Sequence, residues 1–257
     1  MKHIVIFIIS LILFNNLLFA QSNINQVDNK GLKQGEWIKK DPKTNLVVYK
    51  GQFKDNKPIG VFKYFHENTD VIKSEIKFKD DGKTAYAEIF NTSGKIQAKG
   101  KYIDEKRDSV WNFYSDFGEL ISKENYKNGN KEGQSFIYYP NGQLFEEINF
   151  KNDLKDGANK QYYENKQLKS ESNYKNGKLI GKNAYYYPNG MVASVGIYNQ
   201  LGNKNGVWLT KDKDGKTTEK EVYDNGKLLQ GKAAEDWIKN NKNKENPTSK
   251  IEKKKEK

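Results

Sequence analysis

Residues that could do chemistry are few in this chain. It contains no cysteine and only two histidines, His3 and His66. Without thiolates or a pair of histidines, the usual zinc ligand sets cannot form. A Ser-His-Asp triad outside the first twenty residues could use only His66, and no nucleophile-elbow motif accompanies it. We therefore expect His66 to be a strand-end residue near a turn.

Other catalytic motifs are also missing. The sequence has no phosphate-binding loop of the form G-x-x-x-x-G-K-[ST]. Glu146 and Glu147 are adjacent, and adjacent residues of a strand point to opposite faces, so they do not make an acid–base pair. Asn91-Thr-Ser93 fits a glycosylation acceptor, and it also fits a plain turn. We expect a protein that is not an enzyme and that binds no metal and no cofactor.

Two rows of aromatic residues are the best candidates for binding. The first row is Tyr114, Tyr139, Tyr163 and Tyr187, and the second, expected on the opposite face, is Phe113, Tyr138, Tyr162 and Tyr186. Neighbouring rings of a row would lie about 10 Å apart, which is two strand spacings. Both rows could simply pack against their own neighbours. If the first is exposed instead, it offers anchors to a glycan chain, an extended peptide or a protein edge.

Both rows belong to a sequence repeat of 24 or 25 residues. An aromatic residue recurs as Phe53, Phe78, Tyr102, Tyr126, Phe150, Tyr174, Tyr198 and Tyr223. Six residues before each lies a second, mostly aliphatic column: Val47, Ile72, Ile96, Leu120, Leu144, Leu168, Val192 and Thr217. A period in this range is typical of solenoids, propellers and arrays of small units.

Each unit reads as one β-hairpin. Asn141-Gly142 predicts a two-residue type I′ turn, which sets Tyr139 opposite Leu144 and Gly133 opposite Phe150. The same arithmetic sets a glycine opposite the periodic aromatic in three more hairpins, as Gly157–Tyr174, Gly181–Tyr198 and Gly206–Tyr223. With three-residue turns, two further pairs follow, Gly35–Phe53 and Gly60–Phe78. Thr84 and Asp108 take the place of the glycine in the other two. A ring lying flat over each glycine would explain why glycine recurs in a strand.

The predicted fold class is all-β. Links such as Tyr174-Lys-Asn-Gly177 are also turns, so successive hairpins continue as an antiparallel meander of about sixteen strands. One hairpin is marginal in water, and neighbouring units must stabilise each other. We therefore predict an elongated, single-layer sheet of about eight hairpin repeats over residues 31–231.

The flanking segments differ from the repeats. Residues 1–20 fit a signal peptide, with Lys2, the apolar run Ile4–Phe14 and Ala20 before the cut, and they predict export to the periplasm or cell surface. An uncleaved anchor is the alternative, although a span needs about 20 apolar residues. Residues 21–30 are a polar leader. Residues 232–240 predict a short capping helix with one apolar face of Ala234, Trp237 and Ile238, and the Lys-rich tail 241–257 is expected to be disordered.

Positive charge is carried almost entirely by lysine. The net charge is +12, of which Lys2 supplies +1 and Lys239–Lys257, with eight lysines and three glutamates, supplies +5. The repeats and their short flanks therefore hold about +6, and Arg107 is the only arginine. Proteins that read nucleic acids rely on the guanidinium group, so we expect no nucleic-acid partner. The lysines predict a solvated surface or, alternatively, an anion-binding one.

The unit resembles the MORN repeat, and most closely its bacterial variant. The residues that carry the resemblance are Gly35-Glu-Trp37, Gly206-Val-Trp208, Tyr138-Tyr-Pro-Asn-Gly142, Tyr186-Tyr-Pro-Asn-Gly190 and Tyr174-Lys-Asn-Gly177. Many bacterial proteins of this kind are called YwqK family antitoxins of toxin–antitoxin systems. The resemblance implies an elongated single-layer sheet and a scaffold or binding role, with membrane-lipid association proposed for some members. The family motif is structural, so it implies no catalytic residue.

We thus expect an exported, non-enzymatic scaffold that binds an unknown protein or envelope polymer. An antitoxin-like protein that neutralises a toxin by direct binding is one alternative. A second alternative is association with an anionic membrane through the basic tail, where each lysine near the surface contributes about 1 kcal/mol.

Overall fold

The computed structural model describes residues 23–79 and 82–241, and this part of the chain is mostly β-strand. The strands are β1 Gln26–Val27, β2 Lys33–Lys40, β3 Val47–Lys54, β4 Lys57–Phe65, β5 Ile72–Phe78, β6 Thr84–Phe90, β7 Ile96–Ile103, β8 Lys106–Tyr114, β9 Leu120–Lys127 and β10 Asn130–Lys131. They continue as β11 Gly133–Tyr138, β12 Leu144–Lys151, β13 Leu154–Tyr162, β14 Leu168–Lys175, β15 Lys178–Tyr186, β16 Val192–Tyr198, β17 Lys204–Lys211, β18 Thr217–Asp224 and β19 Lys227–Leu229. The helix is α2, Gly231–Asn240.

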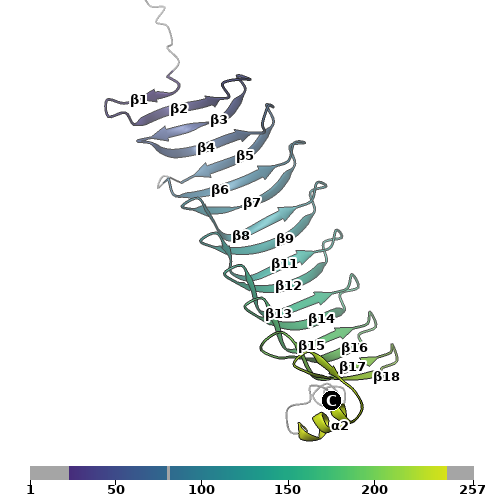
Figure 1. Ribbon diagram of the computed structural model, residues 1–257. Coiled ribbons are helices and arrows are strands. Elements are labelled where there is room, and N and C mark those ends of the chain that lie inside the picture. The colour runs from purple at the N-terminus through teal and green to yellow at the C-terminus, as the bar shows by residue number, and fades with distance from the viewer. Residues whose placement is uncertain (1–22, 80–81, 242–257) are drawn as a thin grey trace, which may run out of the picture.

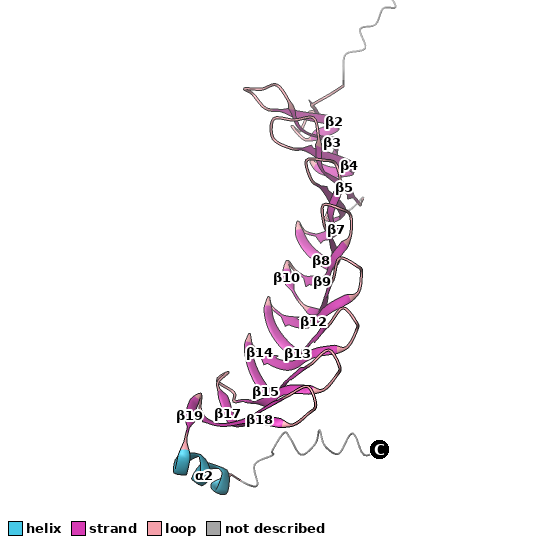
Figure 2. Cartoon of the chain, turned by 90° about the vertical axis from the view of Figure 1, so that its right-hand side faces the viewer, coloured by secondary structure: helices cyan, strands magenta, loops and turns pink. Residues whose placement is uncertain are grey.

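Within the described residues, these strands form one open antiparallel sheet of 19 strands. Each long strand pairs with the strand before it and the strand after it, so the meander runs along a single axis with α2 at one end (Figures 1 and 2). The predicted fold class is confirmed. The strand number exceeds the predicted sixteen because three short strands, β1, β10 and β19, add to the eight hairpins.

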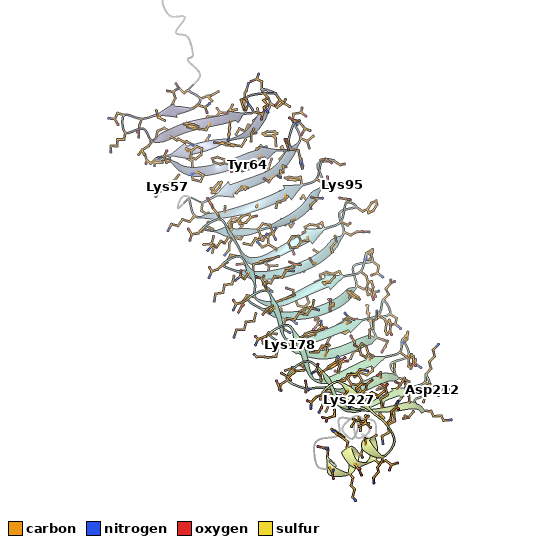
Figure 3. The ribbon with its side chains drawn as sticks, in the orientation of Figure 1. Lys57, Tyr64, Lys95, Lys178, Asp212 and Lys227 are labelled. Atoms are coloured by element: carbon orange, nitrogen blue, oxygen red, sulfur yellow. The ribbon has the colours of Figure 1, made fainter. Side chains whose placement is uncertain are left out.

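Two kinds of turn alternate along the sheet, one on each long edge. The links between hairpins are mostly two-residue turns in which both residues have positive φ, as at Asn128-Gly129, Asn152-Asp153 and Asn176-Gly177. This conformation defines type I′, whose twist matches that of the flanking strands. In Figure 3, Lys57, Lys178 and Lys227, which follow such links, lie on one long edge, while Lys95 and Asp212 lie on the other.

The turn inside the hairpin is different from the prediction. At Tyr139-Pro-Asn-Gly142, the Gly142 amide donates to the Tyr139 carbonyl (2.9 Å), and the Tyr139 amide donates to Gln143 (2.8 Å). The loop therefore has three residues, and Gly142 alone among them takes positive φ (+80°). Proline explains the difference: its fixed φ near −65° suits the first central position of a type I turn and excludes type I′.

A bulge next to each hairpin turn shifts the register by one residue. Tyr138, and not Tyr139, lies opposite Leu144, while Ile137 lies opposite Glu146, so Phe145 is the extra residue. The same shift occurs in the other hairpins, for example between Gln161 and Tyr162. The predicted two-residue turn omits this bulge. The predicted residue pairing is therefore right near the glycine of each hairpin and wrong near its turn.

The predicted pairing of the glycines is confirmed, but the predicted reason is wrong. All six pairs occur, from Gly35–Phe53 to Gly206–Tyr223. Yet a methyl group added at Gly133 or Gly181 would meet no atom within 4 Å, so no ring lies over either glycine. The six glycines share positive φ, between +64° and +110°. At Gly60, Gly157 and Gly181 the pairing with the preceding strand shifts by two residues, and glycine adopts the required backbone without strain.

The two units without this glycine also need a correction. Ala85, and not Thr84, lies opposite Tyr102, and Ser109, and not Asp108, lies opposite Tyr126. Ser109 keeps the left-handed conformation, with φ +60°. Ala85 lies where the β5–β6 pairing shows no register shift, so this unit has no need of a left-handed residue.

Both ends of the sheet are covered. Within the predicted polar leader, β1 pairs with β2, and the Asn25 side chain accepts from the Ile38 amide (2.8 Å) and donates to its carbonyl (3.0 Å). At the other end α2 turns its half-buried Ala234, Trp237 and Ile238 inward, as the sequence predicts. The predicted signal peptide, residues 1–20, and nearly all of the tail 241–257 lie outside the described residues. No helix in the described part is long and apolar enough to cross a bilayer.

Candidate binding faces

The two faces of the sheet have different chemistry. One continuous cross-strand row joins Lys50, Lys63, Glu75, Glu88, Lys99, Asn112, Lys123, Phe136, Glu147, Lys160, Glu171, Ala184, Val195, Leu209 and Lys220. We call the face that holds this row the lysine face. The opposite row begins Tyr49, Tyr64, Ser74, Ile89, Ala98 and Phe113. We call its side the ring face.

Large rings on the ring face lie directly on glycines of the preceding strand. Carbon atoms of the Phe62, Trp111 and Trp208 rings come within 2.1–2.5 Å of where a Cβ would stand at Gly51, Gly100 and Gly196. All three rings are almost fully buried, and the indole Nε1 of Trp111 donates to the Lys101 carbonyl (3.0 Å). These stacks form the ring-face part of the core, and Ala184 and Val195 of the opposite row are also buried.

The occupants of these paired positions match in volume. Where the later strand has a residue smaller than a large ring, the residue opposite it on the preceding strand has a side chain in place of glycine. Examples are Ile76 opposite Ala87 and Ile148 opposite Asn159. The sequence analysis missed these stacks. The signal was available in Gly51-Gln-Phe53, Gly100-Lys-Tyr102 and Gly196-Ile-Tyr198, each followed after eleven or twelve residues by a large ring.

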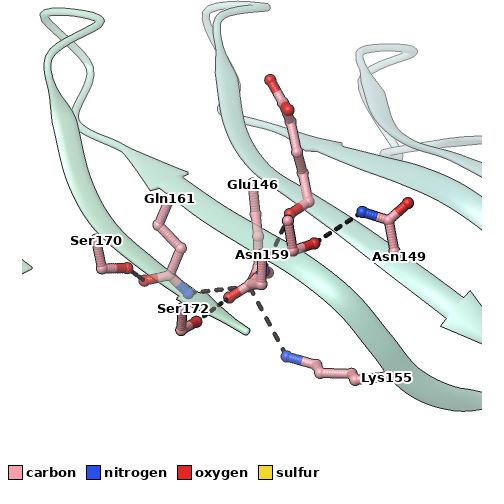
Figure 4. A network of polar contacts seen from close by, with 9 residues as sticks. Glu146, Asn149, Lys155, Asn159, Gln161, Ser170 and Ser172 are labelled. Carbon is pink, nitrogen blue, oxygen red and sulfur yellow. Dashed lines mark hydrogen bonds and ion pairs between the residues drawn. The ribbon is translucent and has the colours of Figure 1, made fainter. Parts of the chain in front are cut away.

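In the middle of the ring face a polar network replaces the rings (Figure 4). The Glu146 carboxylate, 6% exposed, accepts from Asn159 Nδ2 (2.9 Å) and Gln161 Nε2 (3.0 Å). Lys155 Nζ lies 3.8 Å from the same carboxylate. Ser172 Oγ donates to Asn159, and Ser170 Oγ donates to Gln161, at 3.3 Å each. The buried carboxylate is thus compensated by hydrogen bonds, as a buried charge requires.

Cations on the ring face lie over the periodic aromatic column. Lys131, Lys155 and Lys204 stand 4.7–5.3 Å from the ring centroids of Phe150, Tyr174 and Tyr223. The same three lysines also pair with carboxylates, at 3.0–3.8 Å from Glu124, Glu146 and Glu221 respectively. Arg107 lies over Trp111, Phe113 and Tyr126. The charges of this face are therefore largely satisfied within it.

Lysines outnumber carboxylates on the lysine face. At alternating strand positions it presents Lys50, Lys54, Lys63, Lys77, Lys99, Lys101, Lys123, Lys127, Lys151, Lys160, Lys175, Lys182, Lys211 and Lys220. Its carboxylates are Glu36, Glu75, Glu88, Asp108, Glu147, Asp156, Glu171 and Asp224, of which Asp108 pairs with Lys101 (3.3 Å) and Asp156 with Lys175 (3.2 Å). Some pairs form, such as Lys63–Glu75 at 2.7 Å and Lys182–Glu171 at 3.7 Å. Lys50 and Lys63 are direct cross-strand neighbours, and like charges so placed repel.

A tyrosine row flanks these lysines. Tyr114, Tyr138, Tyr162 and Tyr186 occupy equivalent positions, each opposite the aliphatic column. The Tyr162 hydroxyl donates to Glu147 (3.0 Å), and burial together with this carboxylate raises the pKa of Tyr162 to about 12. Burial and Glu171, which accepts from Tyr186 (2.8 Å), likewise raise the pKa of Tyr186.

The predicted binding row is not a single row in the structure. Tyr114 lies opposite Leu120, equivalent to Tyr138 and not to Tyr139, because the repeat steps 24 residues here and the predicted row stepped 25. The true row contains Tyr139, Tyr163 and Tyr187, all half-buried at the start of their hairpin turns. Their hydroxyls donate to the carbonyls of Tyr162, Tyr186 and Lys211, at 2.8–2.9 Å. Each of these tyrosines therefore ties its hairpin to the next one.

His66 occupies the same place in an earlier hairpin. Its Nε2 lies 3.1 Å from the Phe90 carbonyl, so the neutral tautomer with a proton on Nε2 would make the same link. The expected position near a turn is confirmed. Among the described residues, no group of three or more His, Cys, Asp or Glu could hold a metal ion.

The fold and these faces define a β-hairpin repeat protein with two chemically distinct sides. Residues 107–128, 131–152 and 155–176 each match the MORN repeat variant family. The chain therefore contains three consecutive repeats of the MORN variant type between residues 107 and 176.

No curated protein matched the chain. Among solved structures, a TarM mutant from S. aureus, in complex with Fondaparinux, alpha-GlcNAc-glycerol and UDP, matches 47% of this chain with 13% identity and a TM-score of 0.23. A second TarM structure matches 49% of the chain with 16% identity and a TM-score of 0.22. The chain spans 19–20% of the length of those proteins, and at these TM-scores the likeness supports no statement about fold or function.

Proposed function

We propose that this MORN-repeat protein is a non-catalytic scaffold whose lysine face receives an acidic partner, either a protein or an envelope polymer. The separation of charge between the two faces is the observation that supports this function. Ring-face cations such as Lys131, Lys155 and Lys204 pair with carboxylates. On the lysine face Lys99 and Lys123 lie over the rings of Tyr114 and Tyr138, but these two and Lys160 are exposed and form no ion pair among the described residues.

The geometry favours a long partner. The row from Lys50 to Lys220 crosses every long strand from β3 to β18, and equivalent positions repeat about every 10 Å, two strand spacings. A partner that lies along the row would meet several weak contacts at once, and their combination would supply the affinity. Its carboxylates or phosphates would be attracted by the net positive charge, and raising the salt concentration would weaken binding.

The experiment is affinity capture from an envelope extract with three forms of residues 21–257. One is the parent, and one carries Lys99→Glu, Lys123→Glu and Lys160→Glu on the lysine face. The third carries the same change of charge at the hairpin-turn edge: Lys43→Glu, Lys95→Glu and Lys213→Glu. We expect the partner to be retained by the parent and the edge variant and lost by the lysine-face variant. Equal retention by all three forms would count against the function.

We also propose that the protein is exported, on the basis of residues 1–20. The test is fractionation of cells that express the full chain or a chain without residues 2–20. The full chain should reach the periplasm or cell surface, and the shortened chain should stay in the cytoplasm. Finding both in the cytoplasm would remove an envelope partner from consideration.

An antitoxin-like role is a narrower form of the same binding function, and the match to the repeat variant is consistent with the YwqK-like subfamily. It requires a toxin in the same compartment. Co-expression with a toxin encoded beside the gene should relieve growth arrest and should do so less with the lysine-face variant. Growth arrest that is unchanged by the parent protein would dismiss this role.

Association with an anionic membrane through the tail is a separate proposal, which rests on Lys239–Lys257 with its eight lysines and three glutamates. Co-sedimentation with vesicles of phosphatidylglycerol and phosphatidylcholine, using chains with and without this segment, tests it. Equal binding of the two chains would exclude the tail.

A further inference from the structure

A hollow on the lysine face lies over strands β4 to β8. One cross-strand row there joins Val61, Lys77, Tyr86 and Lys101, and Val110 of β8 is among the other residues that line the hollow. The hollow has a volume of about 610 Å³, more than one aromatic side chain requires. Two carboxylates, Glu75 and Glu88, also line the hollow, and Glu75 pairs with Lys63 (2.7 Å).

The apolar lining of the hollow is exposed to solvent. Val61 is 43% exposed, Tyr86 50% and Val110 45%. Three such side chains around one depression differ from the singly scattered apolar residues of an ordinary surface, and a patch of this kind marks an interaction site. Lys77 and Lys101 are the direct cross-strand neighbours of Tyr86. Lys101 already pairs with Asp108 (3.3 Å), so Lys77 is the cation that would receive a carboxylate beside an apolar group of the occupant.

The chain itself presents a segment with this chemistry. In the β8–β9 turn, Phe117 is 85% exposed, the highest value for a large apolar residue in the described part. Asp116 precedes it, and Glu119 follows two residues later. Both carboxylates are exposed, although Asp116 accepts from Asn91 (3.0 Å) and Glu119 from Ser115 (3.0 Å).

Phe117 cannot enter the hollow of its own chain. From Val110 to the end of β8 at Tyr114 the strand runs four residues away from the hollow, about 13 Å at 3.3 Å per residue, and the turn lies beyond. A glycan or nucleic acid lacks aliphatic side chains to match Val61 and Val110, and an acidic turn with a protruding phenylalanine does match them. From this complementarity we propose that the Phe117 turn of one copy docks into the Val61–Tyr86–Val110 hollow of a second copy.

The contact joins two different surfaces, so it is heterologous. Such a contact makes either a closed ring or an open chain of copies, according to the rotation between neighbours. One turn in one hollow is small beside a standard interface, which buries roughly 1,600 Å². Association is therefore concentration-dependent and weakens as salt screens the lysines and carboxylates.

The test is sedimentation of residues 21–257 over a range of concentrations. The weight-average mass of the parent should rise with concentration, and Phe117→Ser should weaken the association at least about tenfold, since burying a phenylalanine is worth about 1.5–3 kcal/mol. Tyr86→Ser should weaken it similarly. Leu201→Ser, which changes an equally protruding residue in another turn (67% exposed), should leave it unchanged.

A mixture of the two weakened variants gives the sharpest result. The Phe117→Ser variant keeps its hollow, and the Tyr86→Ser variant keeps its phenylalanine, so the mixture should form pairs that neither variant forms alone. A parent that remains monomeric at every concentration, a Phe117→Ser variant that associates like the parent, or a mixture that forms no pairs would each overturn the proposal. The inference goes beyond the proposed scaffold function, which the capture experiment tests separately.

Discussion

At the scale of single residues, the ring face is governed by volume. Gly51, Gly100 and Gly196 exist because a ring of the next strand occupies the space of their side chains. The glycines opposite the periodic aromatics exist for another reason, because their backbone has positive φ. Glycine is thus required for two different physical reasons in the same repeat: a ring fills the space beside one kind, and the backbone of the other kind has positive φ.

Gly100→Ala should destabilise the protein by about 1–3 kcal/mol, because the new methyl carbon would stand 2.3 Å from a ring carbon of Trp111. Trp111→Ala should cost about 3–5 kcal/mol through the cavity it leaves. The double change Gly100→Ile with Trp111→Ala imitates the natural Ile76–Ala87 pair. In urea unfolding the double variant should be clearly more stable than the sum of the single effects predicts. Additive effects would show that the two positions do not share one space.

Ser109→Gly should stabilise the protein by about 1 kcal/mol, because Ser109 holds φ +60°, which costs a residue with a Cβ about 1–2 kcal/mol. Its side chain bonds only to the neighbouring Asp108, so little is lost. Gly133→Ala is the matched control, since a methyl group there meets no atom within 4 Å and only the backbone is strained. It should destabilise by a similar amount. Thermal unfolding of both variants measures the two changes in stability. Changes of the same sign would contradict the role of positive φ at these positions.

Stability should fall in alkaline solution between about pH 10 and pH 12. Burial and the Glu124 carboxylate, 2.6 Å from the hydroxyl, raise the pKa of Tyr126 from 10.0 to about 12. The folded state then keeps a proton that the unfolded state loses first, so the stabilisation is complete below pH 10 and is lost as the pH rises toward 12. Tyr126→Phe should flatten this part of the stability curve. Urea unfolding across this pH range checks the slope, and parallel curves would disprove the assignment.

At the scale of elements, two turn types set the unit. Asn-Gly forms a two-residue type I′ turn at the links, and the same dipeptide forms part of a three-residue loop after Pro140 and Pro188. The bulge beside each loop brings Tyr139, Tyr163 and Tyr187 to positions from which they reach the carbonyl of the next unit. The tyrosine row at the loops is thus a set of links between hairpins, and the row behind it faces the lysines.

Tyr163→Phe should destabilise the protein by about 1 kcal/mol, because it removes the hydroxyl that donates to the Tyr186 carbonyl (2.8 Å) and keeps the ring. Hydrogen exchange should show faster opening at the hairpin turn of β15 and β16 than in the parent. Tyr185→Phe serves as a control, since the Tyr185 side chain is 43% exposed and no hydrogen bond of its hydroxyl occurs among the described residues. Equal effects of the two substitutions would argue against a linking role.

At the scale of the whole molecule, the protein is an array in which each strand touches only its neighbours. Stability of such an array is approximately a sum over units and the contacts between them. The ring face holds the array together, and this leaves the lysine face available for a partner. The sheet does not end in open edges, since Asn25 with β1 covers one end and α2 lies at the other.

Removal of the complete unit 155–178 should leave a folded protein. The chain would then pass from β12 through an equivalent link into β15, the first strand of the β15–β16 hairpin. Deletion of Ser172 alone should unfold β14 and its contacts, because every later side chain in that strand would move to the opposite face. Circular dichroism and thermal melting should be used to compare the strand content and stability of the two deletion variants. A folded Ser172 deletion beside an unfolded unit deletion would contradict a modular array.

The sequence by itself determined the period, the hairpin unit, the antiparallel order and the capping helix, because these depend on local turn chemistry and on residues that recur at fixed spacing. It also determined the pairing of Gly133 with Phe150, since that pairing follows from counting outward along two strands. Only the tertiary structure decided which residues near each turn share a face, because one bulged residue, such as Phe145, reverses the count. The stacking of Trp111 on Gly100 and the separation of charge between the faces depend on neighbouring hairpins meeting in register, and no single hairpin contains that information.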